Sequence, residues 1–203
     1  MADLYGGATL RNVYSNATVV SNRKQVGGIM GYSNSRGVND VWYDGSISVN
    51  SAHGREVGGI VGCMDSNNVF EDILFTGTIS FNTDRTDTGV GGIIGVTYSS
   101  STCTPTLKNV ISAGKIVKGT WAGSGNNVVG SVVGIIYKAT VKTQNVYAST
   151  DLWNVTHNIA SGATGTLSGT ISAFAEEKFY GDYAKKNAAA LDYTDGWITR
   201  EDK

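Results

Sequence analysis

One loop of this sequence collects charged side chains that could act on a polysaccharide. It holds Asp84, Arg85 and Asp87, three charged residues within four positions. Glycoside cleavage uses a pair of carboxylates beside the bond that breaks, and sugar binding uses the same groups. A solvated loop also carries such residues. We therefore treat the three as candidate ligand-binding residues and keep a polysaccharide-cleaving β-helix enzyme as an open alternative.

A second loop places one large aromatic ring among small residues. Trp121 lies between Gly119 and Asn127, in a stretch rich in glycine and asparagine. An exposed Trp ring stacks on sugars and anchors protein partners. Trp121 is therefore a candidate ligand-binding residue, with folding of the ring back over the neighbouring chain as the alternative.

The common signatures of catalysis are missing from the sequence. The two histidines, His53 and His157, have no acidic or cysteine partner nearby in the sequence. The patterns His-Glu-x-x-His, Cys-x-x-Cys and Gly-x-Ser-x-Gly are all absent. We expect a protein that is not an enzyme, with no catalytic residue, no metal and no cofactor.

The two cysteines allow a disulfide without requiring one. Cys63 and Cys103 follow glycine-rich phrases at unequal offsets, one residue and eight residues after the phrase. A bridge between them would suit a secreted protein. The unequal offsets favour the alternative, in which Cys63 is a small core residue and Cys103 lies in a loop.

A glycine phrase occurs four times and defines the elements that must position these loops. Its form is Val-Gly-Gly-Ile-x-Gly, and the fourth copy has Ser131 in place of the second glycine. We expect an interior strand in which glycine leaves room for the backbone of the neighbouring copy. The structural glycines are Gly27, Gly28, Gly58, Gly59, Gly91, Gly92 and Gly130. A phosphate loop is a poor alternative, because no Lys-Ser or Lys-Thr pair follows.

A second repeated position holds Asn or Asp before an apolar pair. Its members are Asn12, Asp40, Asp72, Asn109 and Asn145. Asx side chains satisfy backbone groups at tight corners and form ladders when they stack. Calcium binding is the alternative, but no Asp-rich loop surrounds these residues. We expect a ladder or a turn, and ion binding by this column stays open.

Fixed spacing around these positions predicts stacked units. An apolar residue lies six positions after the Val or Ile of each unit, as Val19 does after Val13. Because apolar offsets are both odd and even, each segment has to bend, and Gly45, Gly77 and Gly114 are natural places. Units too small to bury a core align into columns when they stack. The sequence therefore predicts an all-β fold, a parallel β-solenoid (β-helix-like) of about five coils.

The units and the terminal segment divide the chain. We expect units near residues 8–37, 38–69, 70–106, 107–140 and 141–173. Residues 174–203 lack the glycine phrase and gain charged residues and alanine. We expect them to form a C-terminal cap, because the open end of a stack exposes unpaired strand edges.

The combined pattern resembles the GLUG repeat. In this chain it consists of Asn-Val/Ile-apolar, a glycine, an apolar residue and then the glycine phrase, over roughly residues 8–170. A degenerate fifth copy of the glycine phrase is found at Gly165-Thr166-Leu167-Ser168-Gly169. The resemblance implies a module of a large secreted or surface-attached bacterial protein, as in adhesins and the non-catalytic parts of immunoglobulin-A peptidases.

That resemblance also implies a role. The chain would be a non-catalytic adhesin or spacer that binds a host or neighbouring-cell surface protein or glycan through variable loops. An accessory module that targets an attached peptidase or glycanase domain to its substrate is the alternative. Further domains of the same parent chain would then be partners as well.

Composition limits the other partners. Charged residues make up 16% of the chain and the net charge is −1, so the clustered Lys and Arg that nucleic acid requires are missing. No apolar run is long enough to enter a membrane. The first residues do not form a signal peptide, and we expect a piece of a longer secreted or surface protein, without its signal and anchor.

Overall fold

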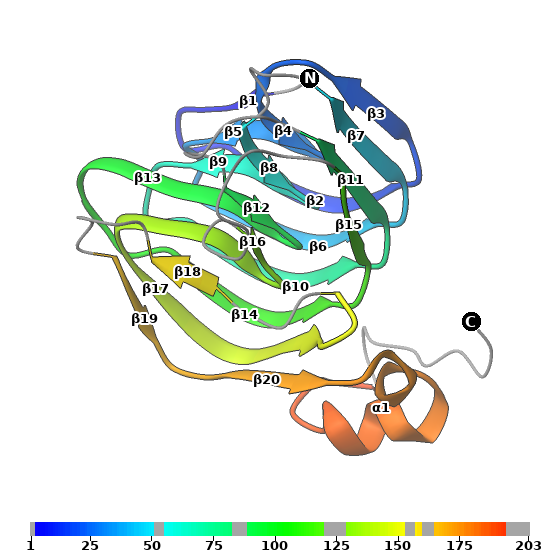
Figure 1. Ribbon diagram of the computed structural model, residues 1–203. Coiled ribbons are helices and arrows are strands. Elements are labelled where there is room, and N and C mark those ends of the chain that lie inside the picture. The colour runs from blue at the N-terminus through cyan, green and yellow to red at the C-terminus, as the bar shows by residue number, and fades with distance from the viewer. Residues whose placement is uncertain are drawn as a thin grey trace.

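The computed structural model of the chain describes residues 3–50, 55–82, 89–119, 129–152, 157–159 and 165–193 (Figure 1). Most of these residues lie in β-strands that pair in parallel. The 3-10 helix η2 (Glu176–Phe179) and the helix α1 (Gly181–Asn187) follow the last described strand. The protein is therefore all-β and is built on parallel sheets.

The described strands form three sheets. The largest has the order β1 (Asp3–Leu4), β5 (Met30–Ser33), β9 (Val61–Met64), β13 (Ile94–Cys103), β17 (Val133–Ser149), β14 (Thr106–Ser112), β10 (Val69–Phe75), β6 (Gly37–Tyr43) and β2 (Thr9–Ser15), and β17 also pairs with β18 (His157–Ile159), β19 (Thr166–Ser168) and β20 (Ile171–Phe174). The second sheet contains β15 (Lys115–Lys118), β11 (Thr78–Asn82), β7 (Ser46–Asn50) and β3 (Thr18–Ser21). The third contains β16 (Val129–Gly130), β12 (Val90–Gly91), β8 (Arg55–Gly58) and β4 (Lys24–Gly27).

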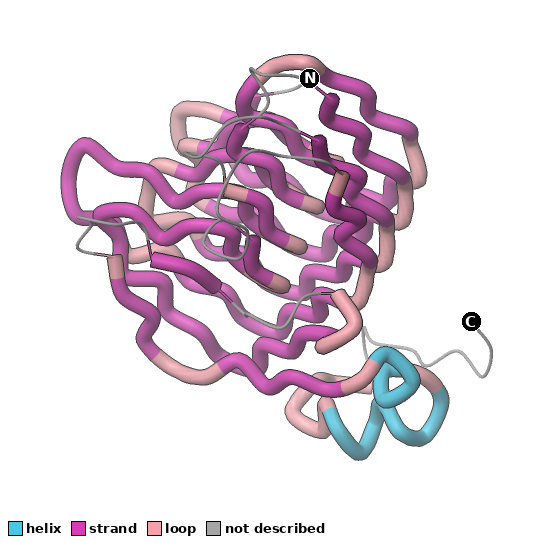
Figure 2. The backbone as a smooth tube through the Cα atoms, viewed as in Figure 1, coloured by secondary structure: helices cyan, strands magenta, loops and turns pink. Residues whose placement is uncertain are grey.

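Equivalent residues of successive units pair with one another in these sheets. Val13 pairs with Val41, and Val41 pairs with Ile73. The same register continues through Val110 and Val146. Neighbouring strands in Figure 2 therefore come from neighbouring units of the chain, and the repeat in the sequence is also a repeat in the structure.

The largest sheet is continuous because of one long strand. β17 pairs with β13 through its first part and with β14 through its second part. The two halves of this sheet are thus joined through a single strand, as Figure 1 shows. The opposite ends of the two halves are the separate strands β1 and β2.

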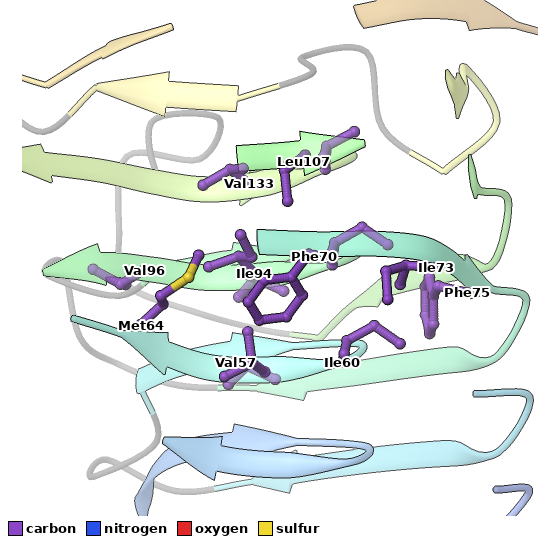
Figure 3. Close-up of a cluster of buried hydrophobic side chains, with 14 of the residues drawn as sticks. Val57, Ile60, Met64, Phe70, Ile73, Phe75, Ile94, Val96, Leu107 and Val133 are labelled. Carbon is purple, nitrogen blue, oxygen red and sulfur yellow. The ribbon is translucent and has the colours of Figure 1, made fainter. Parts of the chain in front are cut away.

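Apolar side chains fill the space between the sheets (Figure 3). Val57 and Ile60 come from the second glycine phrase, and Phe70 and Ile73 come from β10. All four are fully buried. Burial of one such side chain contributes about 1.5–3 kcal/mol, so the interior columns are the main source of stability.

Each unit changes direction at two places. One is the glycine that the sequence suggested, since Gly45, Gly77 and Gly114 lie at bends between consecutive strands. The other is the Asx position inside the preceding strand. The φ angle is between 53° and 56° at Asn12, Asp40, Asp72, Asn109 and Asn145. Asn and Asp tolerate this left-handed conformation better than other non-glycine residues do. It allows Val38 and Val41, on either side of the bend, both to point into the core. Gly77 also permits close approach, because a Cβ there would lie 2.4 Å from the carbonyl oxygen of Gly45. Gly114 has the same role.

The second glycine of the phrase makes room for the next unit. A Cβ on Gly59 would lie 2.0 Å from the carbonyl oxygen of Gly92 and 2.5 Å from the ring of Phe75. In the fourth phrase Ser131 stands at this position, and the residue of the next unit in the column of Phe75 is the small Ala148. The exception in the phrase is therefore matched by a smaller neighbour.

The C-terminal segment, residues 174–193, packs on the outer side of the largest sheet. Ala188 and Leu191 belong to a buried cluster with Ile111, Ala113 and Tyr147, separate from the main core. Figure 1 shows α1 next to β20, the last described strand. The segment covers the apolar outward residues of β14 and β17. Its role as a cap over the end of the stack stays a prediction.

Candidate functional site

Three columns of outward residues run across β2, β6, β10, β14 and β17, and they form the candidate functional surface. The polar column contains Arg11, Asn39, Glu71, Lys108 and Gln144. The Asx column contains Asn12, Asp40, Asp72, Asn109 and Asn145. The outer aromatic column contains Tyr14, Trp42, Leu74, Ile111 and Tyr147.

Side-chain amides connect the Asx column in its later units. Asn109 Nδ2 donates to Asp72 Oδ1 at 3.0 Å, and Asn145 Nδ2 donates to Asn109 Oδ1 at 2.9 Å. Each donor belongs to the later unit, so the ladder has a direction. An ionised carboxylate accepts hydrogen bonds but cannot donate them. No such bond can therefore form between the carboxylates of Asp40 and Asp72 when both are ionised. No group of three His, Cys, Asp or Glu that could hold a metal is found in the described part of the chain.

Glu71 is the centre of the polar column. Lys108 Nζ donates to Glu71 Oε1, and Asn39 Nδ2 donates to Glu71 Oε2 at 3.4 Å. The pKa of Lys108 is raised, mainly because its ammonium group donates a hydrogen bond to Glu71. Arg11, at the other end of this column, is exposed and forms no ion pair with any described residue.

The later half of the outer aromatic column is covered by the C-terminal segment. Ile111 and Tyr147 are 6% and 7% exposed, and the ring centroids of Tyr147 and Phe174 are 6.5 Å apart. Tyr193 packs against the same cluster and donates its hydroxyl to Ala184 O at 3.0 Å. Burial raises the pKa of Tyr193 to about 12. This half of the column is an internal interface.

The first half of the outer aromatic column is open. The side chain of Tyr14 is 55% exposed, and its ring centroid lies 4.6 Å from that of Trp42. Trp42 Nε1 donates to Thr76 Oγ1 at 2.8 Å, and Thr76 Oγ1 donates to Asp44 Oδ1 at 2.8 Å. These bonds fix the indole ring. The open half thus offers a held aromatic pair beside a hydroxyl and a carboxylate, an arrangement suited to binding.

Cys63 and Cys103 are both buried, and the disulfide that the sequence allowed is not formed. The register gives the reason. Cys63 pairs with Val96 of the next unit, whereas Cys103 pairs with Ala139. The two cysteines therefore lie in different columns. Burial is the main cause that raises the pKa of Cys63 to about 12, so this thiol stays protonated and unreactive at neutral pH.

A buried polar cluster lies at the corner before β10, and the sequence analysis did not single it out. Asn68 Nδ2 donates to Ser33 Oγ at 2.8 Å and to Ser35 Oγ at 3.0 Å. The backbone carbonyl of Asn68 accepts a bond from Thr106 N at 2.8 Å. These bonds connect three successive units at one corner. The doubled Asn before an apolar strand is the signal that could have found this position.

The strongest ligand-binding candidates of the sequence lie outside the described residues. They are Trp121, Asp84, Arg85 and Asp87. His53 also lies outside them. The roles assigned to these residues therefore stay predictions, and the described surface offers the open half of the outer aromatic column instead.

Comparison of the chain with models of protein families, with curated proteins and with solved structures finds no match in any of the three. Among the described helices, none has both the length and the apolar character needed to cross a bilayer. The columns, and the residues at their open end, are therefore the features of the chain that bear on its function.

Proposed function

We propose that the chain is a non-catalytic binding module, a parallel β-solenoid of five coils that presents ligand-binding side chains in rows. The in-register pairing of equivalent residues supports the solenoid. The resemblance to the GLUG repeat supports a secreted or cell-surface bacterial protein and a role as adhesin or spacer. Rows of side chains repeat at the strand spacing of about 4.8 Å, which suits contact with an extended ligand.

The observation that carries this proposal is the exposed ring of Tyr14 beside Trp42. Aromatic rings stack on the apolar face of a sugar, while neighbouring polar groups bind its hydroxyls. The carboxylate of Asp44 and the hydroxyl of Thr76 supply such groups beside Trp42. We therefore assign a glycan as the ligand of the open half.

The geometry favours binding because little motion has to be lost. Trp42 is held through Thr76 by Asp44, and Tyr14 packs on Trp42. Side chains that are already ordered cost less entropy when a ligand immobilises them. The open half is thus preorganised on a rigid sheet.

A glycan-binding screen with the purified chain tests the proposal, followed by calorimetry on the best ligand. We expect Tyr14→Ala to weaken binding about tenfold, which corresponds to about 1.4 kcal/mol. Tyr14 is exposed, so this variant should keep the fold. Tyr183→Ala is the matched control, because Tyr183 is 58% exposed but lies on α1.

Three results would contradict the proposal. The first is a glycan that binds Tyr14→Ala as tightly as the parent chain, and the second is the absence of any bound glycan. The third is shortening of a glycan during incubation with the pure chain, which would show catalysis. Trp121→Ala in the same assay tests the separate prediction that the loop between Gly119 and Asn127 carries the binding.

A further inference from the structure

The strands of the first unit have an edge that no other described strand pairs with. In later units, the strand of the preceding unit pairs with the corresponding edge. Within the described residues, β2, β3 and β4 stand at the ends of their sheets and pair on one side only. Interior side chains show the same difference, because Val13 is partly exposed whereas Val41 is 1% exposed. An edge with free backbone groups and apolar side chains can accept an added strand.

The residues on this edge match those of a strand whose partner is present in the structure. β14 carries Lys108 and Asn109 in the columns where β2 carries Arg11 and Asn12. Asn12 has a φ of 55° and Asn109 a φ of 53°, so the chain bends alike at both positions. β2 is therefore the counterpart of β14 in charge and in backbone conformation.

β14 uses these two side chains to hold the strand of the preceding unit. Lys108 Nζ bonds to Glu71, and Asn109 Nδ2 donates to Asp72 Oδ1 at 3.0 Å. Both acceptors belong to β10, which runs parallel to β14 in register. The corresponding side chains of β2, Arg11 and Asn12, form no ion pair and no hydrogen bond with another described side chain. A cation and an amide donor thus stand at an open edge.

We propose that the free edge of β2 binds an extended polypeptide as an added parallel strand. The partner has an apolar residue, two acidic residues and a Val or Ile in succession, as in the segment 70–73 of this chain. Its acidic side chains bind Arg11 and Asn12, and its apolar side chains cover Leu10 and Val13, which are partly exposed. Main-chain bonds supply affinity, and the charged pair fixes the register.

This surface adjoins the proposed glycan site, because Tyr14 also lies on β2, but the two depend on different groups. The added strand lies along the edge of the sheet and depends on the charge of Arg11. The glycan lies on the outer face and depends on the ring of Tyr14. Either proposal can therefore fail while the other holds.

A fluorescein-labelled peptide that copies residues 67–76 is the probe, and fluorescence anisotropy is the measurement. A second peptide of the same segment, called the reversed peptide because its charges are reversed, carries Glu71→Lys and Asp72→Lys. We expect the acidic peptide to bind the parent chain and to bind the Arg11→Glu chain about tenfold more weakly, because like charges then face each other. The reversed peptide should prefer Arg11→Glu. Arg23→Glu is the control, since Arg23 is also exposed and lies in the turn between β3 and β4.

Hydrogen exchange supplies a second readout. We expect amides of β2 (Thr9–Ser15) to gain protection when the acidic peptide is added. Circular dichroism checks that Arg11→Glu is folded, and Arg11→Gln replaces it if it is not. The proposal is overturned if the acidic peptide does not bind by about 1 mM. It is also overturned if both peptides bind all variants equally, or if protection appears elsewhere and not on β2.

Discussion

The first and second units share one sequence pattern but differ in their surroundings. Val41 lies between two strands and is 1% exposed, whereas Val13, in the same column, has a strand on one side and is partly exposed. Tyr14 of the first unit is likewise more exposed than Trp42 of the second unit. Position in the stack, and not residue type, decides how much each residue stabilises the fold and which side chains remain available to a ligand.

The largest expected effect comes from filling the space at a glycine of an inner unit. A Cβ on Gly59 meets the carbonyl of Gly92 at 2.0 Å, so Gly59→Ala should lower the free energy of unfolding by about 3 kcal/mol in urea denaturation. Gly28→Ala should cost less, because the first unit can move outwards. Ser131→Ala is the control, since this position already carries a Cβ. Equal losses for Gly28→Ala and Gly59→Ala would contradict the difference between the units.

Truncation of one matched valine pair gives the next effect. Val41→Ala should lower the free energy of unfolding by about 2 kcal/mol, because it removes fully buried methyl groups. Val13→Ala should cost less than about 1 kcal/mol, because its methyl groups are already partly in water. Thermal and urea unfolding of both variants measure this. If Val13→Ala costs as much as Val41→Ala, the first unit is as well packed as the second.

Tyr43 connects the first two units and gives the fold an alkaline limit. Its single hydroxyl hydrogen is shared between Ala17 O, at 2.8 Å from the hydroxyl oxygen, and Ser46 O, at 3.1 Å, and burial raises its pKa to about 12. The unfolded chain loses this proton near the ordinary value of about 10. The stabilisation is therefore complete below pH of about 10 and is lost as the pH rises towards about 12.

Tyr43→Phe separates these effects. At neutral pH the substitution should lower the free energy of unfolding by about 1 kcal/mol, because the shared hydrogen bond is lost. Between pH of about 10 and 12 its stability should fall less steeply than that of the parent, as measured by urea denaturation at each pH. Parallel pH profiles for the two proteins would show that another group sets the alkaline limit.

The smallest expected effect concerns the direction of the Asx ladder. In Asp72→Asn the new amide can donate to Asp40, as Asn109 donates to Asp72, and stability should rise by about 0.5–1 kcal/mol. Asn109→Asp is the opposite change and should destabilise by about 1 kcal/mol, because it replaces a donor with a second carboxylate. Thermal denaturation compares the two. A loss of stability in Asp72→Asn would mean that the ladder gains nothing from a further donor.

The parallel all-β fold follows from features that the sequence displays directly. Fixed spacing placed Val13, Val41 and Ile73 in one column, and the structure pairs them. Repeated columns are visible in a sequence because stacking imposes one environment on each position. The repeated glycine also predicts the close approach at Gly59, since only glycine fits beside a neighbouring backbone.

Other features depend on contacts that spacing does not encode. The second change of direction, at Asp40 and its equivalents, depends on a positive φ that Asx residues accept, and the spacing of apolar residues does not reveal it. The equivalence of Arg11 and Lys108 becomes informative only when the partner Glu71 is placed beside one of them. The free state of Cys63 depends on which column it enters.

The long strand β17 has a mechanical consequence. It joins both halves of the largest sheet, whereas β1 and β2 at the opposite end are separate strands. We expect a force that pulls on residue 3 to detach β1 and β2 before it reaches β17, one unit after another. Each unit of about 30 residues would release roughly 100 Å of extended chain. The protein should therefore lengthen in steps when it is pulled from this side.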